Sequence, residues 1–492
     1  MTYELERPSR ERKPPRMPSL SAQDPSPRLH DGPSPAPQKS NRTLILSAAG
    51  WSTGGYVASQ FVRIASNLIL TRLLAPEMFG IAAAAAMVSY IVVLLADIGL
   101  HQAVIQSPRG DDPEFLDTVW VVQIIRGTLI WIGCIVIAVA IGHAASLGWM
   151  PAHSVYASPE LPLVIILGTS GIFIDGFQST KRITSYRRMG LNRITMIDLY
   201  SQLGATALGL AVAWLTHSVW ACIVFGPASA LITTILSHVW IPGRQDRFRL
   251  NRKFAVELLR FGRWIMFSSF FTILASNGDK MMMGSWASTQ TFGLYTLAFG
   301  LIGILDGVGA RLQSSVTLPA LSKMARENRE RFRTSYLKLR ASFDIFYLLG
   351  AGGIFACGQL VVDLVYDDRY AAAGPMLQIL SFSLVTARYG IMNSVYLAIG
   401  EPRNVGILNL AKAGLLFVAV PISYWLFGFE GALWAAALHQ LPIIPLIFFY
   451  NSRHRLNSVA FEVFILLAWP AGYLIGRVLL SFISYVSAGI AA

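Results

Sequence analysis

Apolar residues occur in long uninterrupted runs along the chain from residue 44 onward, separated by short polar segments. A run of roughly 20 apolar residues is long enough for one helix to cross the hydrocarbon core of a bilayer. The pattern predicts twelve such spans, at 44–71, 79–105, 118–142, 161–180, 194–215, 219–242, 258–284, 292–318, 343–365, 373–398, 405–426 and 432–450. A thirteenth apolar stretch, 459–488, contains Pro470 and Gly472, so it is either one kinked span or a re-entrant pair.

Composition excludes an ordinary soluble protein. Of the 492 residues, 54% are hydrophobic and 14% charged, and the mean hydropathy is +0.52. Soluble domains carry about 25% charged residues. The predicted class is therefore an all-α polytopic membrane protein without a soluble domain.

Lys and Arg alternate between the two sides of the predicted spans. The segment 1–43 and the loops on its side carry 29 of them, whereas the opposite loops carry two, Arg72 and Arg369. Because cytoplasmic loops are enriched in Lys and Arg, this bias predicts a multi-pass membrane protein with a cytoplasmic N-terminus. The basic loops are expected to contact anionic lipid headgroups, and no nucleic-acid partner is needed to explain them. Segment 1–43, rich in Pro, Ser and Arg, is predicted to be a disordered tail.

The chain repeats itself weakly. PEMFGI at 76–81 and TQTFGL at 289–294 are 213 positions apart, and each opens a span after a short outer loop. Such a repeat predicts two parallel six-helix lobes, between which transporters commonly place their substrate path. The expected organisation is a tail, an N-lobe, a basic linker, a C-lobe and a C-terminal hydrophobic segment, at 1–43, 44–242, 243–256, 257–450 and 451–492.

Ionisable residues inside the spans are the candidate functional groups, because burying a charge in hydrocarbon is costly. The deeply placed ones, which we expect to face a central aqueous cavity, are Arg63, Asp279, Lys280, Asp306 and Arg388. Those near span ends, which we expect to reach the interface, are Arg126, Arg260, Asp198 and Asp344. Arginine and lysine in such a cavity can offset the charge of a diphosphate headgroup.

Other chemistry has little support in the sequence. The three cysteines lie inside apolar runs, the histidines show no metal-ligand spacing, and no phosphate-binding G-x-x-x-x-G-K-[ST] motif occurs. We therefore expect no catalytic residues, no metal and no cofactor, and a transporter rather than an enzyme.

Three stretches resemble the polysaccharide exporters, or Wzx-type flippases, of the multidrug/oligosaccharidyl-lipid/polysaccharide (MOP) superfamily. They are ILTRLLAPEMFGIAAAA at 69–85, GDKMMMGSWASTQTFGLYTLAFGL at 278–301 with LPALSKM at 318–324, and YAAAGPMLQIL at 370–380. The resemblance implies two six-helix lobes around a central cavity. It also implies a bacterial inner-membrane protein that moves an undecaprenyl-pyrophosphate-linked oligosaccharide repeat unit from the cytoplasmic to the periplasmic leaflet. We expect this movement to occur by alternating access without covalent chemistry.

By position, the resemblance assigns the pyrophosphate to cationic residues, namely Arg63, Lys280, Arg311, Arg263 and Arg388. The candidate ion-coupling carboxylates are Asp97, Asp279 and Asp306. The expected partners are the lipid-linked oligosaccharide, membrane lipids and other polysaccharide-assembly proteins. Three alternatives stay open: a lipid II flippase, a multidrug antiporter of the same superfamily, and a membrane enzyme of polysaccharide assembly.

Overall fold

The computed structural model describes residues 41–96, 98–107, 109–187, 190–313, 317, 321, 324 and 329–491. Within these residues every regular element is a helix, and residues 45–492 form one compact unit. The predicted tail falls almost entirely outside the described residues.

The described residues of the first half of the chain form nine α-helices. They are α1 (Asn41–Leu73), α2 (Pro76–Leu95), α3 (Leu100–Gln106), α4 (Pro113–Ser146), α5 (Leu161–Gly168), α6 (Ser170–Asp175), α7 (Lys181–Arg187), α8 (Leu191–Thr216) and α9 (Trp220–Val239). Local sequence explains where several begin. The Asp112 side chain accepts a hydrogen bond from the Glu114 backbone N–H, and Pro113 occupies the first turn of α4, where no backbone donor is needed.

The second half contains longer helices and more breaks. Its α-helices are α10 (Arg252–Trp286), α11 (Thr289–Leu312), α13 (Arg329–Val365), α14 (Ala373–Leu380), α15 (Ser383–Ala387), α16 (Ile391–Ala398), α17 (Pro402–Leu438), α18 (Ile444–Arg453), α19 (Val459–Leu466) and α20 (Ala468–Ala491). Gly428 lies inside α17 with a φ of 66°, so this element is two helices joined at a sharp kink. The predicted boundary between spans 405–426 and 432–450 falls at this kink.

The polytopic all-α class is confirmed. Eight helical stretches among the described residues are long and apolar enough to cross a membrane, and one of them, Arg403–Arg453, is long enough for two spans. Another, Val459–Ile483, runs through α19 and α20, so by length and composition the thirteenth apolar stretch is a candidate for a single span. The predicted spans on α1, α5–α6, α10 and α14–α16 remain predictions.

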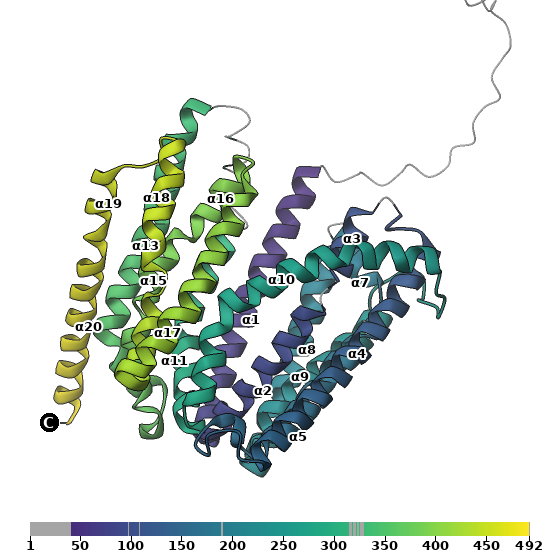
Figure 1. Cartoon of the computed structure of the whole chain (residues 1–492), viewed down its shortest axis with the longest axis horizontal. Coiled ribbons are helices and arrows are strands. Elements are labelled where there is room, and N and C mark those ends of the chain that lie inside the picture. Colours follow the sequence, from purple (N-terminus) through teal and green to yellow (C-terminus); the bar gives the residue numbers. More distant parts are fainter. Residues whose placement is uncertain are drawn as a thin grey trace, which may run out of the picture. The chain divides into compact units, whose positions relative to one another are not determined.

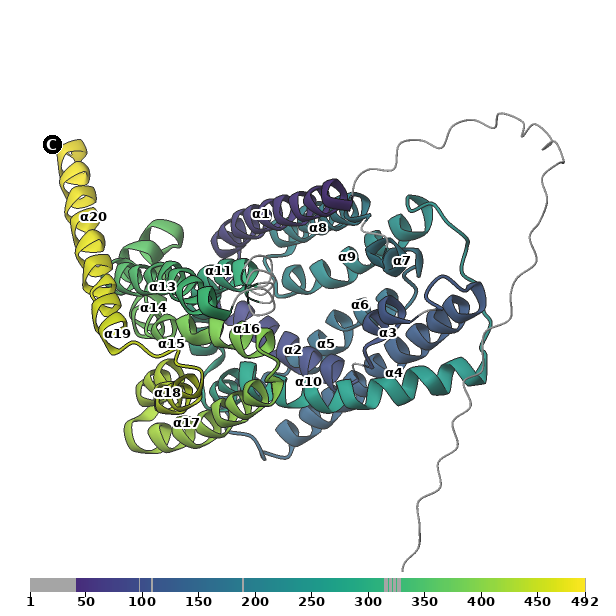
Figure 2. The same cartoon turned by 90° about the horizontal axis from the view of Figure 1, so that it is seen from above.

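The helices pack in two groups, which we call the N-lobe (α1–α9) and the C-lobe (α11 and α13–α18). Figures 1 and 2 show the purple-to-teal N-lobe helices beside the green-to-yellow C-lobe helices. Helix α10 bridges them, since it packs against α2 and α4 and also against α17. Helix α20 packs along α13 on the far side of the C-lobe (Figure 1).

The two lobes meet most closely where α2 and α11 begin. A Cβ atom added at Gly80 would lie 2.0 Å from the Thr289 carbonyl oxygen, and one added at Gly293 would lie 2.1 Å from the Pro76 carbonyl oxygen. Adding the 213-residue offset of the sequence repeat to positions 76 and 80 gives 289 and 293. The two contacts are therefore reciprocal, as the offset of the predicted repeat would place them.

Further contacts join the lobes on this same face, the one opposite the basic loops. The Tyr370 hydroxyl donates to the Leu74 carbonyl oxygen at 2.8 Å, and Arg369 donates to the Thr71 carbonyl oxygen at 3.2 Å. The Ser154 hydroxyl donates to the Gly284 carbonyl oxygen at 3.2 Å. The lobes are thus hydrogen-bonded to each other on the face with few basic residues.

Candidate substrate and coupling cavities

Two cavities lie beside helix α11. One lies within the C-lobe and has a volume of about 470 Å³; the other, of about 230 Å³, lies between α1, α8 and α11. Asp306 lines the first and Arg311 lines the second. Five helical positions turn a side chain by about 140°, so the two residues face different sides of α11. This helix therefore forms part of the wall of both cavities.

The C-lobe cavity collects ionisable and amide side chains from α10, α11, α16 and α17. Asp279, Asp306, Asn393, Asn409, Lys412 and His439 are among those that line it. The buried Asp279 carboxylate accepts a hydrogen bond from the Tyr295 hydroxyl at 2.5 Å, and Asp306 accepts one from Tyr347 at 3.1 Å. Two carboxylates and one lysine around a single polar space can hold and exchange a small cation.

The smaller cavity, which we call the interlobe cavity, is polar and takes side chains from both lobes. Arg311 lies over the Tyr56 ring, with 5.8 Å between the guanidinium carbon and the ring centroid. The Ser59 hydroxyl donates to the Gln202 amide oxygen at 2.6 Å, which ties α1 to α8. Gly307 leaves room for Tyr56, because a Cβ there would lie 2.7 Å from the Tyr56 hydroxyl oxygen. A cation, hydroxyls and an aromatic face are the groups that a phosphorylated sugar requires.

The other predicted cations are placed differently. Arg63 is exposed and lies seven residues after Tyr56, on the same face of α1. Lys280 is half-buried, donates to the Asn277 amide oxygen at 3.1 Å and lies 4.2 Å from the centroid of the Phe299 ring. The side chain of Arg263 and the whole of Asp97 lie outside the described residues.

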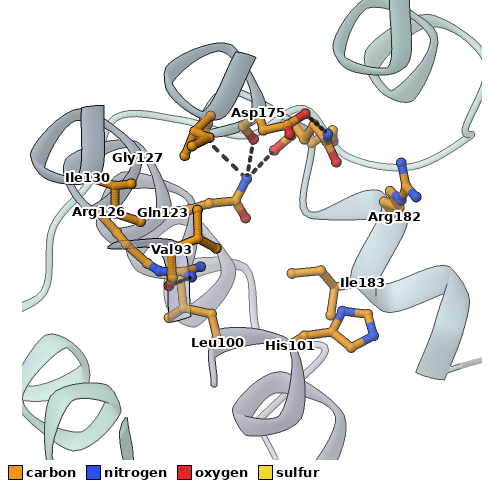
Figure 3. Close-up of a pocket in the computed structure, with 14 residues that line it drawn as sticks. Val93, Leu100, His101, Gln123, Arg126, Gly127, Ile130, Asp175, Arg182 and Ile183 are labelled. Carbon is orange, nitrogen blue, oxygen red and sulfur yellow. Dashed lines mark hydrogen bonds between the residues drawn. The ribbon is translucent and has the colours of Figure 1, made fainter. Parts of the chain in front are cut away.

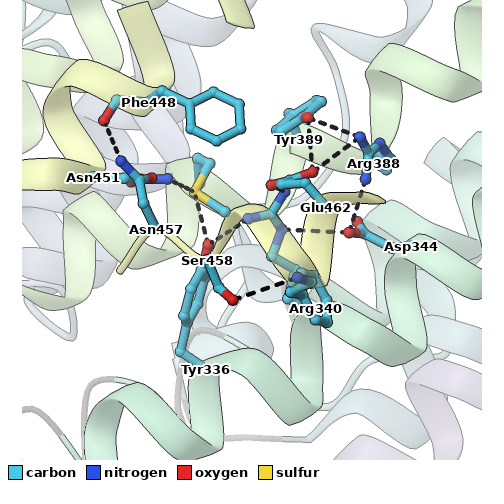
Figure 4. A network of polar contacts seen from close by, with 12 residues as sticks. Tyr336, Arg340, Asp344, Arg388, Tyr389, Phe448, Asn451, Asn457, Ser458 and Glu462 are labelled. Carbon is cyan, nitrogen blue, oxygen red and sulfur yellow. Dashed lines mark hydrogen bonds and ion pairs between the residues drawn. The ribbon is translucent and has the colours of Figure 1, made fainter. Parts of the chain in front are cut away.

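Arg388 does not line either cavity. It is 3% exposed, and its guanidinium contacts Asp344 at 3.0 Å and Glu462 at 3.2 Å. Arg340 pairs with the same two carboxylates, and Tyr389 donates to Glu462 at 3.1 Å. Figure 4 shows this closed network of two arginines and two carboxylates joining α13, α19 and the turn before α16. The two positive charges of the network equal its two negative charges, so the charge of Arg388 is neutralised inside the protein and is not available to a substrate.

Asp344 also differs from its expected place. Its carboxylate is fully buried between the two arginines, so the expectation that it reaches the interface is wrong. Arg340 and Glu462 are not among the candidates that the sequence predicts: Arg340 lies between the predicted spans 292–318 and 343–365, and Glu462 lies in the last apolar stretch. An isolated glutamate in an apolar run was the available signal, because such a residue needs a buried partner.

The N-lobe contains a third cavity, of about 440 Å³, near the basic face. Figure 3 shows Gln123 donating to backbone carbonyl oxygens of the segment that follows α6. Arg126 donates to the Ala96 carbonyl oxygen at 2.7 Å, at the end of α2. Arg182 pairs with Asp198 at 2.7 Å. The polar groups of this cavity therefore bind backbone carbonyl oxygens near the ends of α2 and α6, or pair with each other.

Comparison with known proteins identifies the family. The model of a family described as "Polysaccharide biosynthesis protein" matches residues 69–375, more than half of the chain. The chain belongs to this family. It is similar to the lipopolysaccharide biosynthesis protein WzxC of Escherichia coli K12, with 22% identity over 88% of this chain and 86% of that protein. It is also similar to the succinoglycan biosynthesis transport protein ExoT of Rhizobium meliloti, with 20% identity over 70% and 67%.

Solved structures agree on the fold of this family member. The lipid II flippase MurJ in an inward closed conformation matches with a TM-score of 0.61 and 14% identity, over 87% of this chain and 98% of MurJ. An inward-facing multidrug resistance MATE transporter of the MOP superfamily matches with a TM-score of 0.58 and 16% identity, over 87% and 96%. These structures show the shared fold, and the family model and the two relatives bear out the resemblance to Wzx-type polysaccharide proteins. The chain is a multi-pass membrane protein of the polysaccharide biosynthesis family.

Proposed function

We propose that this protein flips undecaprenyl-pyrophosphate-linked oligosaccharide repeat units from the cytoplasmic to the periplasmic leaflet of the inner membrane. The observation that carries the proposal is the interlobe cavity, where Arg311 of one lobe lies against Tyr56 of α1 and faces the polar groups of α8. Relatives named for lipopolysaccharide biosynthesis and succinoglycan transport support a saccharide cargo.

In this proposal the diphosphate binds near Arg311 in the interlobe cavity. Arg63 and Lys280 contribute positive charge at other points of the route that the headgroup takes across the membrane. Arg63 lies about 10 Å along α1 from Tyr56, since each helical residue advances 1.5 Å. Arg263, on α10, stays a proposed contributor, whereas Arg388 is left out because two buried carboxylates neutralise it. The charged residues would offset the desolvation of a headgroup that carries two or more negative charges.

Coupling to an ion is assigned to the C-lobe cavity. Asp279 and Asp306 supply carboxylates that can bind a proton or a metal cation. Lys412 lines the same cavity, and its ammonium group would be repelled by the bound cation. Because Asp306 and Arg311 belong to one helix, cation binding in the C-lobe cavity can change the position of Arg311. Asp97 remains a predicted coupling residue.

The proposed cycle is alternating access between the lobes. The contacts of Tyr370, Arg369 and Ser154 hold the lobes together on the face with few basic residues, which the charge bias assigns to the periplasm. A headgroup would enter from the basic, cytoplasmic face and leave when these contacts break. The lipid chain would stay at membrane depth throughout.

The test is flipping of a fluorescent undecaprenyl-pyrophosphate oligosaccharide by purified protein in liposomes. We expect the Arg311→Ala/Lys280→Ala variant to flip at least about tenfold more slowly, which corresponds to about 1.4 kcal/mol. The matched control is Arg477→Ala, because Arg477 is an exposed arginine on α20 that lines neither cavity. Partial recovery in Arg311→Lys would support a role of charge. An unchanged rate in the double variant would refute the proposal.

The same liposomes separate the alternatives. Flipping of lipid II at the rate of the oligosaccharide lipid would favour a lipid II flippase. Ion-dependent export of a cationic dye without flipping of either lipid would favour a multidrug antiporter. Chemical change of the oligosaccharide lipid would favour an enzyme of polysaccharide assembly.

A further inference from the structure

An apolar groove continues from the interlobe cavity along helix α1. The groove has a volume of about 530 Å³ and is lined by Gly50, Trp51, Gly54, Gly55, Thr195 and Leu199. Gly55, Thr195 and Leu199 also line the interlobe cavity, so the two spaces meet at these residues. Figure 2 shows α1 and α8, which supply the walls, lying alongside each other.

The chemistry changes from one end of this continuous space to the other. The interlobe end presents Arg311, the Tyr56 and Ser59 hydroxyls and the Gln202 amide. Asp198 also lines this end, and its charge is paired with Arg182. The other end presents mainly carbon atoms, from glycine backbone, Trp51 and Leu199. A space that is cationic at one end and apolar at the other fits an anionic amphiphile.

Three glycines of α1 determine where this helix touches α8 and where the groove is left empty. A Cβ added at Gly55 would lie 2.1 Å from the Thr195 methyl carbon, so Gly55 lets α1 touch α8. A Cβ added at Gly50 or at Gly54 would meet no heavy atom within 4 Å. These two glycines lie one helical turn apart and leave a channel along the helix that larger side chains would fill.

We propose that this groove holds the polyisoprenoid chain of the substrate while its diphosphate lies at the Arg311 end. The proposal rests on the proposed function and adds a site for the lipid part of the cargo. Continuity with the cationic cavity selects this occupant, because a chain in the groove places its own headgroup beside Arg311. Contacts between the chain and the groove wall would add affinity for a long chain over a short one, because each added isoprenoid unit that lies in the groove makes further van der Waals contacts.

The test compares two probes that share a diphosphate and differ in chain length: undecaprenyl diphosphate and geranyl diphosphate. Equilibrium binding is measured with the full-length protein in detergent, for the wild type and for Gly50→Leu/Gly54→Leu. The added leucines enter open space, so folding should persist. The matched control is Gly414→Leu on α17, where a Cβ also meets nothing within 4 Å and where exposed Leu410 and Val418 mark a lipid-facing surface.

We expect the groove-filling variant to bind undecaprenyl diphosphate about tenfold more weakly and geranyl diphosphate almost unchanged, a loss of about 1.4 kcal/mol for the long chain alone. Gly414→Leu should leave both affinities as in the wild type. The thermal unfolding temperature should match between the two glycine variants.

Three results would overturn the inference while leaving the proposed function intact. They are unchanged binding of both probes, an equal loss for both probes, and displacement of undecaprenyl diphosphate by phosphatidylglycerol in proportion to acyl-chain length. The last result would make the groove a general lipid site. Failure of the wild-type protein to bind either diphosphate would instead reject the proposed function, and the inference with it.

Discussion

The close contact between α2 and α11 at Gly80 and Gly293 predicts that a larger side chain at either glycine will push the two lobes apart and destabilise the protein. Replacing Gly80 by alanine places a Cβ atom 2.0 Å from the Thr289 carbonyl oxygen. Real Cβ atoms essentially never approach closer than 3.0 Å, so the helices must separate by at least about 1 Å. Overpacking of this kind costs about 1–3 kcal/mol.

The higher helix propensity of alanine opposes this cost. Alanine is a better helix former than glycine by about 1 kcal/mol, so an unhindered Gly→Ala change should stabilise its helix. Gly414→Ala provides this reference on α17, because nothing lies within 4 Å of its Cβ position. The difference between Gly80→Ala and Gly414→Ala therefore isolates the cost of the crossing.

Thermal unfolding of the purified protein in detergent measures this difference. We expect Gly80→Ala and Gly293→Ala each to unfold at a lower temperature than Gly414→Ala, by similar amounts because the contacts are reciprocal. The double variant should lose less than the sum of the two losses, since the first separation of the helices also relieves the second contact. If Gly80→Ala unfolds at or above the temperature of Gly414→Ala, the close crossing is refuted.

Three further outcomes follow from the ion pairs. Glu462→Gln should destabilise the protein by about 3–5 kcal/mol in the same assay, because it leaves the buried arginines with one carboxylate fewer. Arg388→Met in the Glu462→Gln background should recover part of that loss; no recovery would argue against the network. In the outer loop, the hydrogen bond from Arg369 holds the pKa of Asp367 below its usual value, so its stabilising contribution is present above the usual pKa near 3.8 and lost as pH falls through the lowered one. Arg369→Gln should remove this acid sensitivity, measured as unfolding temperature against pH.

The class of the protein and the positions of the spans on α2, α4, α8, α9, α11, α13 and α17–α18 could be predicted because they depend on signals that are local in the sequence. Hydropathy and the Lys/Arg bias are properties of segments, and the 213-residue offset pairs Gly80 with Gly293 without any structure. A single residue could not be placed with the same success. Depth in a span gives the cost of a charge but not the neighbouring helix that neutralises it.

Arg388 and Arg311 illustrate the difference between depth and direction, since only the fold decides which helix a deep cation faces. Arg388 looked like a cavity residue because it is deep, yet Glu462, 74 positions later, meets it. Arg311 lines the interlobe cavity because α11 turns it toward α1 and α8. The cavity that Lys412 and Asp306 share likewise depends on which faces of distant helices meet. Periodicity within one span does not contain that information.

The position of Glu462 on α19 has a consequence for biosynthesis. During translation, Arg340 and Arg388 enter the bilayer more than 70 residues before their second carboxylate is made. Until the final span leaves the ribosome, Asp344 alone balances two guanidinium groups, so the C-lobe cannot complete its interior. A chain that stops before residue 459 would retain one uncompensated buried positive charge, so its C-lobe would be less stable than that of the full sequence.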